Sequence, residues 1–143
     1  MVILVGLASP TAASPTAPRI ATPASASTIV ELSALVEQAR QRFVARDAAG
    51  VLAYVAENYR SGGLTKAAIR AQILALYSVY ETLRARVHVD RVDIVDGRAW
   101  VYTTGEIAGY LPVVGWVTVF SWEREPEVAG REGLVWRLVG FQD

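Results

Sequence analysis

The sequence predicts an α+β domain in which three helices precede an antiparallel sheet. Apolar residues recur at helical spacing from Leu32 to Leu83, and from Val87 onward the period changes to two. Within the second part, Asp96-Gly97 separates two alternating runs, which is the strongest short-range signal for a β-hairpin. The order of these signals predicts three helices packed in a strongly curved antiparallel sheet.

The first residues differ in composition from the rest of the chain. Residues 8–28 are almost entirely Ala, Ser, Thr and Pro, with too few bulky apolar groups to offset the entropy of ordering. The apolar run before them, Val2–Ala8, is too short to span a bilayer but resembles the end of a signal-peptide core. We therefore expect residues 1–28 to be a signal-peptide remnant or a disordered tail, and residues 29–143 to be one domain. Export to a periplasmic or extracellular location is expected, with a cytoplasmic location as the alternative.

Polar residues mark the start of each predicted helix. Thr28 and Glu31 fit a capping box, Asp47 is placed to cap a short second helix, and Thr65 is placed to cap the third. The third helix is expected to bury one side that holds Ile69, Ile73, Leu76, Tyr77 and Tyr80.

The Asp-Gly turn fixes the register of the first two strands. Ile94 then lies opposite Ala99, and Val92 lies opposite Val101, so these four residues share one apolar face. Without a bulge, the same face receives His88, Asp90 and Thr103, a polar cluster at the end of an apolar surface.

A β-bulge gives a different arrangement of the same strand. Val87 and Val89 are out of phase with Val92 and Ile94, and one extra residue near Asp90 or Arg91 would bring all four valine and isoleucine side chains together. His88 would then point to the opposite face. The sequence leaves both arrangements open.

Two further strands are expected at residues 113–124 and 134–141, the first entered at Pro112 and Gly115 and ended by Glu125-Pro126. One face of the sheet should pack on the helices. The other face carries Trp100, Tyr102 and Trp116, and we expect it to form a homodimer.

The composition excludes several functions. Basic and acidic side chains number 14 each, which argues against nucleic-acid binding. The chain has no cysteine and one histidine, which argues against a Cys- or His-rich metal site. No nucleotide-binding loop is present, and Gly105–Gly109 lacks the required pattern. We therefore expect no cofactor, no metal and no membrane span.

The order of elements resembles the nuclear-transport-factor-2-like superfamily. The similarity covers residues 29–143 and rests on Phe43–Gly50 between the first two helices, Val92–Ala99 at the hairpin, and the closing Trp136-Arg137-Leu138. The resemblance implies a cone with a cavity at its open end. Relatives include ketosteroid isomerase, SnoaL-like cyclases, dehydratases and non-catalytic binding domains, so the fold does not specify the chemistry.

The resemblance also suggests which side chains would face such a cavity. His88, Asp90 and Glu106 are the candidate bases, Tyr54, Tyr77 and Tyr80 are candidate hydrogen-bond donors, and Thr103 could orient a ligand. Each of these residues also has an ordinary structural explanation, as a core tyrosine or a solvated strand residue. The main hypothesis is a homodimeric domain that binds a small apolar ligand or serves as an accessory domain. The alternatives are a cofactor-free isomerase, cyclase or dehydratase, and a protein-interaction domain without a ligand.

Overall fold

The computed structural model describes residues 20–143, so most of the predicted tail lies outside the described residues. The elements in chain order are β1 (Ala21–Pro23), α1 (Ala26–Val44), α2 (Ala48–Leu52), β2 (Arg60–Ser61), β3 (Leu64–Thr65), α3 (Lys66–Val79), β4 (Thr82–Val95), β5 (Arg98–Leu111), β6 (Gly115–Glu132) and β7 (Val135–Leu138). The predicted α+β class with helices before the main strands is confirmed.

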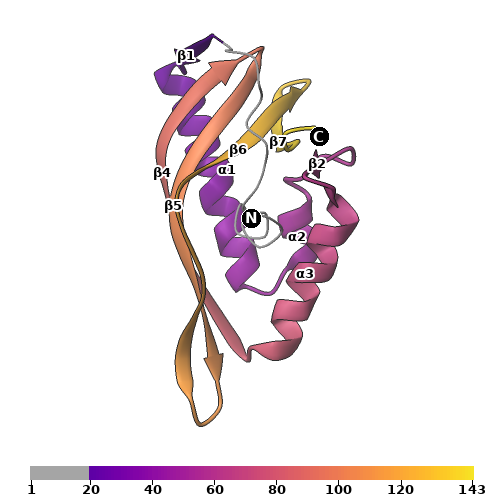
Figure 1. Ribbon diagram of the computed structural model, residues 1–143, viewed down its shortest axis with the longest axis vertical. Coiled ribbons are helices and arrows are strands. Elements are labelled where there is room, and N and C mark those ends of the chain that lie inside the picture. The colour runs from indigo at the N-terminus through magenta and orange to yellow at the C-terminus, as the bar shows by residue number, and fades with distance from the viewer. Residues whose placement is uncertain (1–19) are drawn as a thin grey trace.

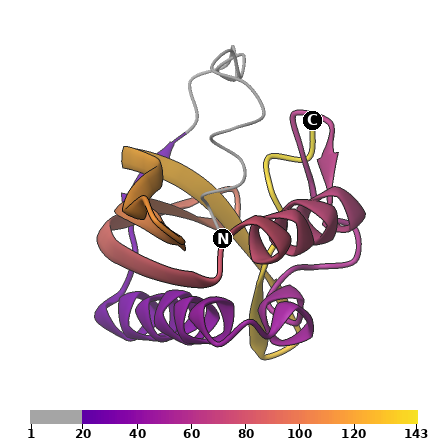
Figure 2. The ribbon, with the colours of Figure 1, turned by 90° about the horizontal axis from the view of Figure 1, so that it is seen from below.

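A single antiparallel sheet organises the domain. Its strand order is β1-β4-β5-β6-β7, and β2 pairs only with β3. The helices lie on one side of this sheet, and the hairpin of β5 and β6 extends past them (Figures 1 and 2). The strong curvature expected for the sheet stays a prediction.

Helix α1 begins earlier than the sequence predicts. Its N-cap is Ser25, whose hydroxyl accepts a hydrogen bond from the amide of Thr28, so Thr28 lies inside the first turn. Serine caps a helix as well as threonine does. The sequence favours Thr28 as the cap because Glu31, three residues later, completes a capping-box pattern. The caps predicted at Asp47 and Thr65 are confirmed, since their side chains accept from the amides of Gly50 and Ala68.

The hairpin of β4 and β5 has the predicted register and contains a bulge. Ile94 pairs with Ala99 and Val92 with Val101, and the register then shifts between Val89 and Arg91. The extra residue is Asp90. The shift turns Val87 and Val89 toward the core, as the bulge hypothesis predicts.

Strand β6 does not end where the sequence suggests. It continues through Pro126, which pairs with Tyr102, and reaches Glu132. A proline is tolerated here because β7 pairs only with Ala129–Glu132, so β6 has an unpaired edge at residue 126.

The core lies between the helices and the inner face of the sheet. Its fully buried members come from both layers: Leu32, Val51, Ile69, Ile73, Val92, Val101 and Ile107. None of the helices within residues 20–143 is long and apolar enough to cross a membrane.

Candidate functional site

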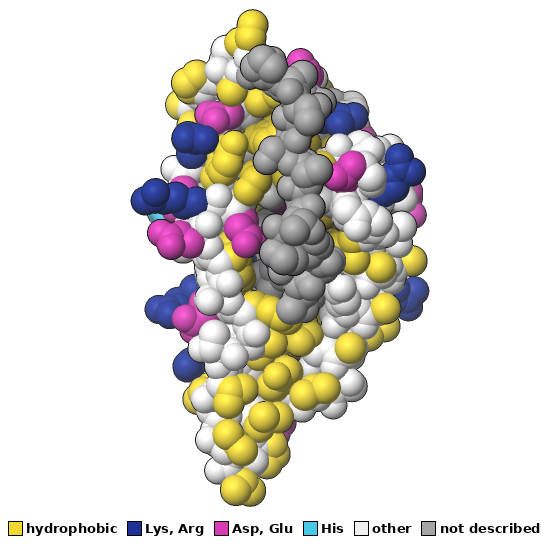
Figure 3. Space-filling model, in the orientation of Figure 1, with side chains coloured by type: hydrophobic (Ala, Val, Ile, Leu, Met, Phe, Trp, Pro, Cys, Tyr) yellow, Lys and Arg dark blue, Asp and Glu magenta, His cyan; other side chains and the backbone are white. Residues whose placement is uncertain are grey.

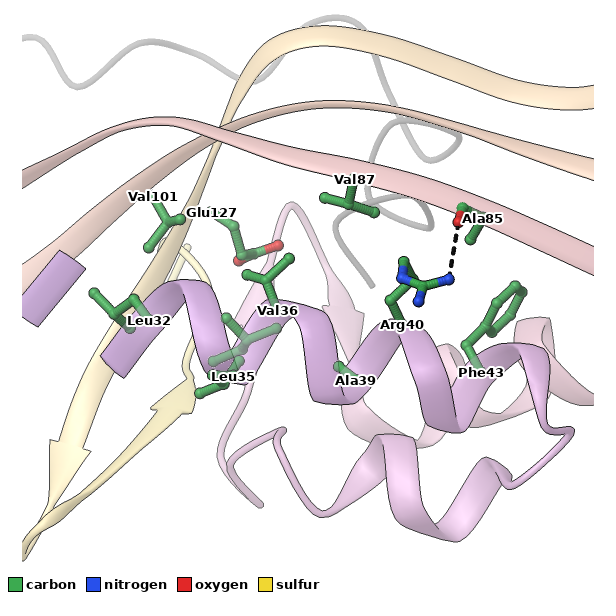
Figure 4. A pocket seen from close by; sticks show the side chains of 11 residues that line it. Leu32, Leu35, Val36, Ala39, Arg40, Phe43, Ala85, Val87, Val101 and Glu127 are labelled. Atoms are coloured by element: carbon green, nitrogen blue, oxygen red, sulfur yellow. Dashed lines mark hydrogen bonds between the residues drawn. The ribbon is translucent and has the colours of Figure 1, made fainter. Parts of the chain in front are cut away.

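A small cavity lies between α1 and the inner face of the sheet (Figure 4). Among the described residues the lining is apolar except for two side chains, and it consists of Leu32, Leu35, Val36, Ala39, Arg40 and Phe43 from α1, with Ala85, Val87, Val101, Glu127 and Leu138 from the strands. The free volume is about 20 Å³, which is room for one water molecule.

Glu127 places a carboxyl group in this apolar interior. Residues alternate between the two faces of a strand, and Glu127 pairs with the buried Val101 across the β5–β6 ladder, so both point inward. The residue is only 1% exposed. Among the described residues no arginine, lysine or histidine forms an ion pair with it.

Two donors contact the Glu127 carboxyl. The hydroxyl of Tyr59 lies 3.3 Å from Oε1 and 3.2 Å from Oε2, and the amide of Val128 donates to Oε1 at 3.2 Å. Tyr59 follows α2 and is itself buried, so its hydroxyl is held inside the protein. The two donors leave part of the acceptor capacity of a carboxylate unused.

Burial determines the protonation of this pair. Removal from water raises the pKa of Glu127 to about 7, although the amide of Val128 and the hydroxyl of Tyr59 favour the charged form. Burial also raises the pKa of Tyr59, and the nearby Glu127 charge adds to the effect. Near neutral pH, Glu127 is therefore present in both protonation states and Tyr59 remains a donor.

Arg40 is the second polar residue of the lining, and it closes the gap between α1 and β4. Its Nη1 donates to the carbonyl of Ala85 at 3.2 Å, and its Nε and Nη2 donate to Glu37 at 2.9 and 2.7 Å. The ion pair holds the pKa of Glu37 at about 2, well below its usual range. Arg40 thus forms its hydrogen bonds with Glu37 and with the carbonyl of Ala85, and not with Glu127.

The three predicted tyrosine donors lie outside this cavity. Tyr77 donates to the carbonyl of Phe43 at 2.7 Å, and burial raises the pKa of Tyr77 to about 12. Tyr54 donates to Gln38 at 2.9 Å. Tyr80 packs directly over Gly109, where a Cβ atom would lie only 2.2 Å from the ring. Their proposed role toward a ligand stays a prediction.

The predicted acids and bases are also separate from Glu127. His88 is exposed on the outer face because of the bulge, 3.8 Å from Asp90, which in turn accepts from Thr104 at 2.7 Å. Glu106 lies 3.4 Å from Arg86 on the same outer face. The structure therefore brings His88 and Asp90 together, but it does not place either one in the lining of the cavity.

Thr103 is the one predicted site residue that is fully buried on the inner face. Its hydroxyl accepts from Nε1 of Trp122 at 3.0 Å, which satisfies the indole inside the core. Thr103 does not line the cavity around Glu127.

The three aromatic residues of the predicted dimer face have partners within the chain. Trp100 meets Phe141 edge to face, with the ring centres 5.3 Å apart. The guanidinium of Arg91 lies 4.3 Å from the Tyr102 ring, and that of Arg84 lies 4.1 Å from the Trp116 ring. Dimerisation through this face stays a prediction.

Within residues 20–143 no group of three or more His, Asp and Glu side chains is arranged to hold a metal ion. Glu127 carries the one carboxyl group among the described residues of the lining, and this group can accept hydrogen bonds and exchange a proton.

Comparison with known proteins supports the fold. No family model matches the sequence, and no curated protein matches it. Solved structures do match: a cystatin-like protein from Nostoc punctiforme has a TM-score of 0.64 at 12% identity, covering 83% of this chain and 91% of its own. An NTF2-like protein from Pseudomonas putida has a TM-score of 0.59 at 15% identity, covering 81% and 84%.

The same domain also matches part of a larger protein. Bd1075 of Bdellovibrio bacteriovorus has a TM-score of 0.60 at 15% identity, covering 82% of this chain, and this chain spans 42% of that protein. At such identities the likeness concerns the fold alone. The chain therefore has the cystatin-like α+β fold seen in NTF2-like proteins, as its resemblance to the nuclear-transport-factor-2-like superfamily predicts.

Proposed function

We propose that the domain binds a small, largely apolar molecule between α1 and the sheet, with Glu127 as its polar anchor. The observation that supports this is a carboxyl group, 1% exposed, in a lining that is apolar apart from Arg40, which is bound to Glu37 and Ala85. Among the described residues the carboxyl has no cationic partner. Burial of an ionisable group in such surroundings is unfavourable, so structural proteins seldom place one there without a pairing charge. A ligand that donates a hydrogen bond would satisfy the unused oxygen positions.

Entry of such a ligand requires the lining to move. A free volume of about 20 Å³ accepts a single water, whereas typical ligand pockets are more than ten times larger. The half-buried Val36 and the Arg40–Ala85 hydrogen bond lie on the side where α1 meets β4. We expect α1 to shift from β4 when a ligand binds.

The first experiment is a fluorescence titration of the full chain with N-phenyl-1-naphthylamine, a neutral apolar probe with one N–H donor. Glu127→Gln keeps the shape of the side chain but removes its charge, and Glu106→Gln makes the same change on the outer face. We expect Glu127→Gln to weaken binding about tenfold, because a hydrogen bond to a charged group contributes about 1.5–3 kcal/mol, and Glu106→Gln to have no effect.

A second variant tests the position of the ligand independently. Val36→Ala enlarges the cavity, so the probe should bind more tightly to it than to the wild type. Affinity should also rise with pH through 7, because the ionised Glu127 is the stronger acceptor. Equal affinities for the wild type, Glu127→Gln and Val36→Ala would contradict the proposed site.

The second candidate is a cofactor-free enzyme that moves a proton, as in an isomerase, cyclase or dehydratase. The specific support is the pKa of about 7 for Glu127 beside the Tyr59 hydroxyl, which supplies a base and a donor together. Deuterium uptake from D2O into 2-tetralone, an apolar ketone, tests this candidate. Uptake that Glu127→Gln abolishes would support catalysis, whereas probe binding without uptake would leave a binding domain.

A homodimer remains part of the proposal for the outer face. Light scattering on the full chain at several concentrations gives its mass, and Tyr102→Glu places a charge at the centre of the predicted interface. A dimer that becomes a monomer in Tyr102→Glu would support the interface, and a monomeric wild type would contradict it.

A further inference from the structure

The hairpin between β5 and β6 exposes apolar side chains at its tip. Residues 107–122 include no charged side chain, although 20% of the whole chain is charged. At the tip Val113 is fully exposed and Val114 is 67% exposed. The hairpin extends beyond the helices (Figure 1). Many hydrophobic side chains lie on the visible surface at that end, and no charged ones are seen at its tip (Figure 3).

The tip retains valine at a position where valine is strained. Val113 has φ of +73°, in the left-handed region that β-branched residues strongly disfavour. The turn between β4 and β5 places Asp96 and Gly97 at positive φ, and the turn before β7 places Gly133 there. Asparagine or glycine would fit the tip with less strain. Valine at this position therefore indicates that the apolar side chain itself has a use.

Aromatic and cationic groups lie behind the tip in a defined order. Tyr110 and Trp116 pair across the hairpin, with ring centres 5.5 Å apart at 70°, and Trp116 is 42% exposed. The guanidinium of Arg84 lies 4.1 Å from the Trp116 ring. Within the described residues Arg84 has no carboxylate at ion-pair distance, whereas its neighbour Arg86 pairs with Glu106 at 3.4 Å.

From this order we infer that the hairpin tip, residues 111–116, inserts into the surface of a bilayer that contains anionic phospholipids. This order matches the layers of a lipid leaflet. The aliphatic side chains of the tip correspond to the acyl layer, the aromatic rings to the interface, and the guanidinium to the phosphate layer. Trp116 comes one residue after Gly115, which pairs with Leu111 at the end of the ladder. At about 3.3 Å per strand residue this places Trp116 close behind the turn, within the depth of an interfacial anchor. The surplus positive charge of Arg84 complements a lipid phosphate, and a convex tip fits a fluid surface.

Co-sedimentation of the full chain with vesicles tests the inference. The vesicles are phosphatidylcholine alone and phosphatidylcholine mixed with phosphatidylglycerol. Val113→Asn removes the apolar side chain and suits the left-handed backbone, so the variant should remain folded. Leu134→Asn is the matched control, because Leu134 is 91% exposed in the turn before β7 but has charged neighbours at Arg131 and Glu132. All proteins carry the same residues 1–28, so any affinity of that segment for lipid is common to them.

We expect Val113→Asn to reduce vesicle binding about tenfold, the effect of one buried valine, and Leu134→Asn to leave it unchanged. Arg84→Gln should abolish the preference for vesicles with phosphatidylglycerol while it leaves binding to phosphatidylcholine intact. Brominated lipids should quench part of the tryptophan fluorescence, and Trp116→Phe should remove the quenched part.

Three results would overturn the inference. The first is equal vesicle binding by the wild type and Val113→Asn. The second is quenching that Trp116→Phe does not change, since the hairpin would then not be the inserted segment. The third is a wild-type dimer that Val113→Asn converts to a monomer with no difference in vesicle binding, which would make a second copy of the chain the partner of the tip.

Discussion

The cavity at Glu127 and the tip at Val113 depart from ordinary protein structure in opposite ways. At the cavity, an ionisable group lies inside an apolar interior. At the tip, apolar side chains stand in solvent on a strained backbone. Glu127 lies on β6, and Val113 lies in the turn that joins β5 to β6, so the same sheet must supply the stability that each exception costs. One strand pair therefore carries two unfavourable groups, the Glu127 carboxyl near one end and the Val113 side chain beyond the other.

The largest expected effect comes from a change between the two regions. Gly105 lies where a Cβ atom would be 2.2 Å from the Trp122 ring and 2.6 Å from the backbone oxygen of Arg86. Gly105→Ala should therefore reduce the free energy of unfolding by about 3 kcal/mol or more. Urea denaturation measures this change. A loss below about 0.5 kcal/mol would show that the sheet is not the rigid support of both ends.

The next effect concerns the cavity and depends on pH. Burial raises the pKa of Glu127 from its ordinary 4.5 to about 7, so between these values the folded chain holds a proton that the unfolded chain has released. The contribution of Glu127 to the free energy of unfolding is therefore greatest below pH 4.5. This contribution is lost as the pH rises through 7, and the total loss is about 3 kcal/mol. Denaturation curves from pH 5 to 8 should show this decline in the wild type. A decline of the same size in Glu127→Gln would assign it to other groups.

A smaller effect is expected from Tyr59→Phe. The change removes the hydroxyl that donates to Glu127 and should cost about 1–2 kcal/mol at pH 8, where the carboxylate is charged. The cost should shrink at pH 5, because a protonated carboxyl needs the donor less. The Tyr59 hydroxyl lowers the pKa of Glu127, so its removal should raise this pKa further. The free energy of unfolding of Tyr59→Phe should therefore decline at a higher pH than that of the wild type. A pH-independent cost would mean that only packing is lost.

The smallest effect is expected at the tip and has the opposite sign. Val113→Asn relieves the strain of a β-branched residue at φ +73° and should raise the free energy of unfolding by about 1 kcal/mol. Thermal denaturation in the absence of lipid measures the gain. A destabilised Val113→Asn would indicate that the valine contributes packing to the hairpin, contrary to its full exposure.

The sequence predicts local features well where a short motif decides the geometry. Asp96-Gly97 predicts the correct register for two long strands. The phase of Val87 and Val89 raises a bulge near Asp90 or Arg91 as one of two arrangements, and the structure has the bulge at Asp90. The caps at Asp47 and Thr65 follow from their own side chains. Each of these features depends on residues within a few positions of one another.

The cavity around Glu127 cannot be predicted from such short local motifs. Pro126 reads as the end of a strand, so Glu127 falls in the expected loop, although it is an inward-facing strand residue. Whether a proline ends a strand depends on the neighbouring edge, which is set by how far β7 extends. Its partner Tyr59 is distant in sequence and lies in a segment between helices, so only the tertiary structure brings the two together. The tip is not evident from the sequence for a simpler reason. The sequence pattern places residues 113 and 114 inside a strand, whereas in the structure they lie in the turn between β5 and β6.

The parallel bridge between Val55 and Leu138 has a consequence for the folding pathway. Each long hairpin of the sheet joins strands that are neighbours in the chain. The bridge instead joins the segment after α2 to the last strand, so the entropic cost of closing its loop is greater. The amide of Ala56 donates to Leu138, and the amide of Leu138 donates to Tyr54, so this closure also sets the position of Tyr59 beside Glu127. Folding would therefore take up the Glu127 proton late, after the transition state. Stopped-flow measurements from pH 5 to 8 should then show that pH changes the unfolding rate more than the refolding rate.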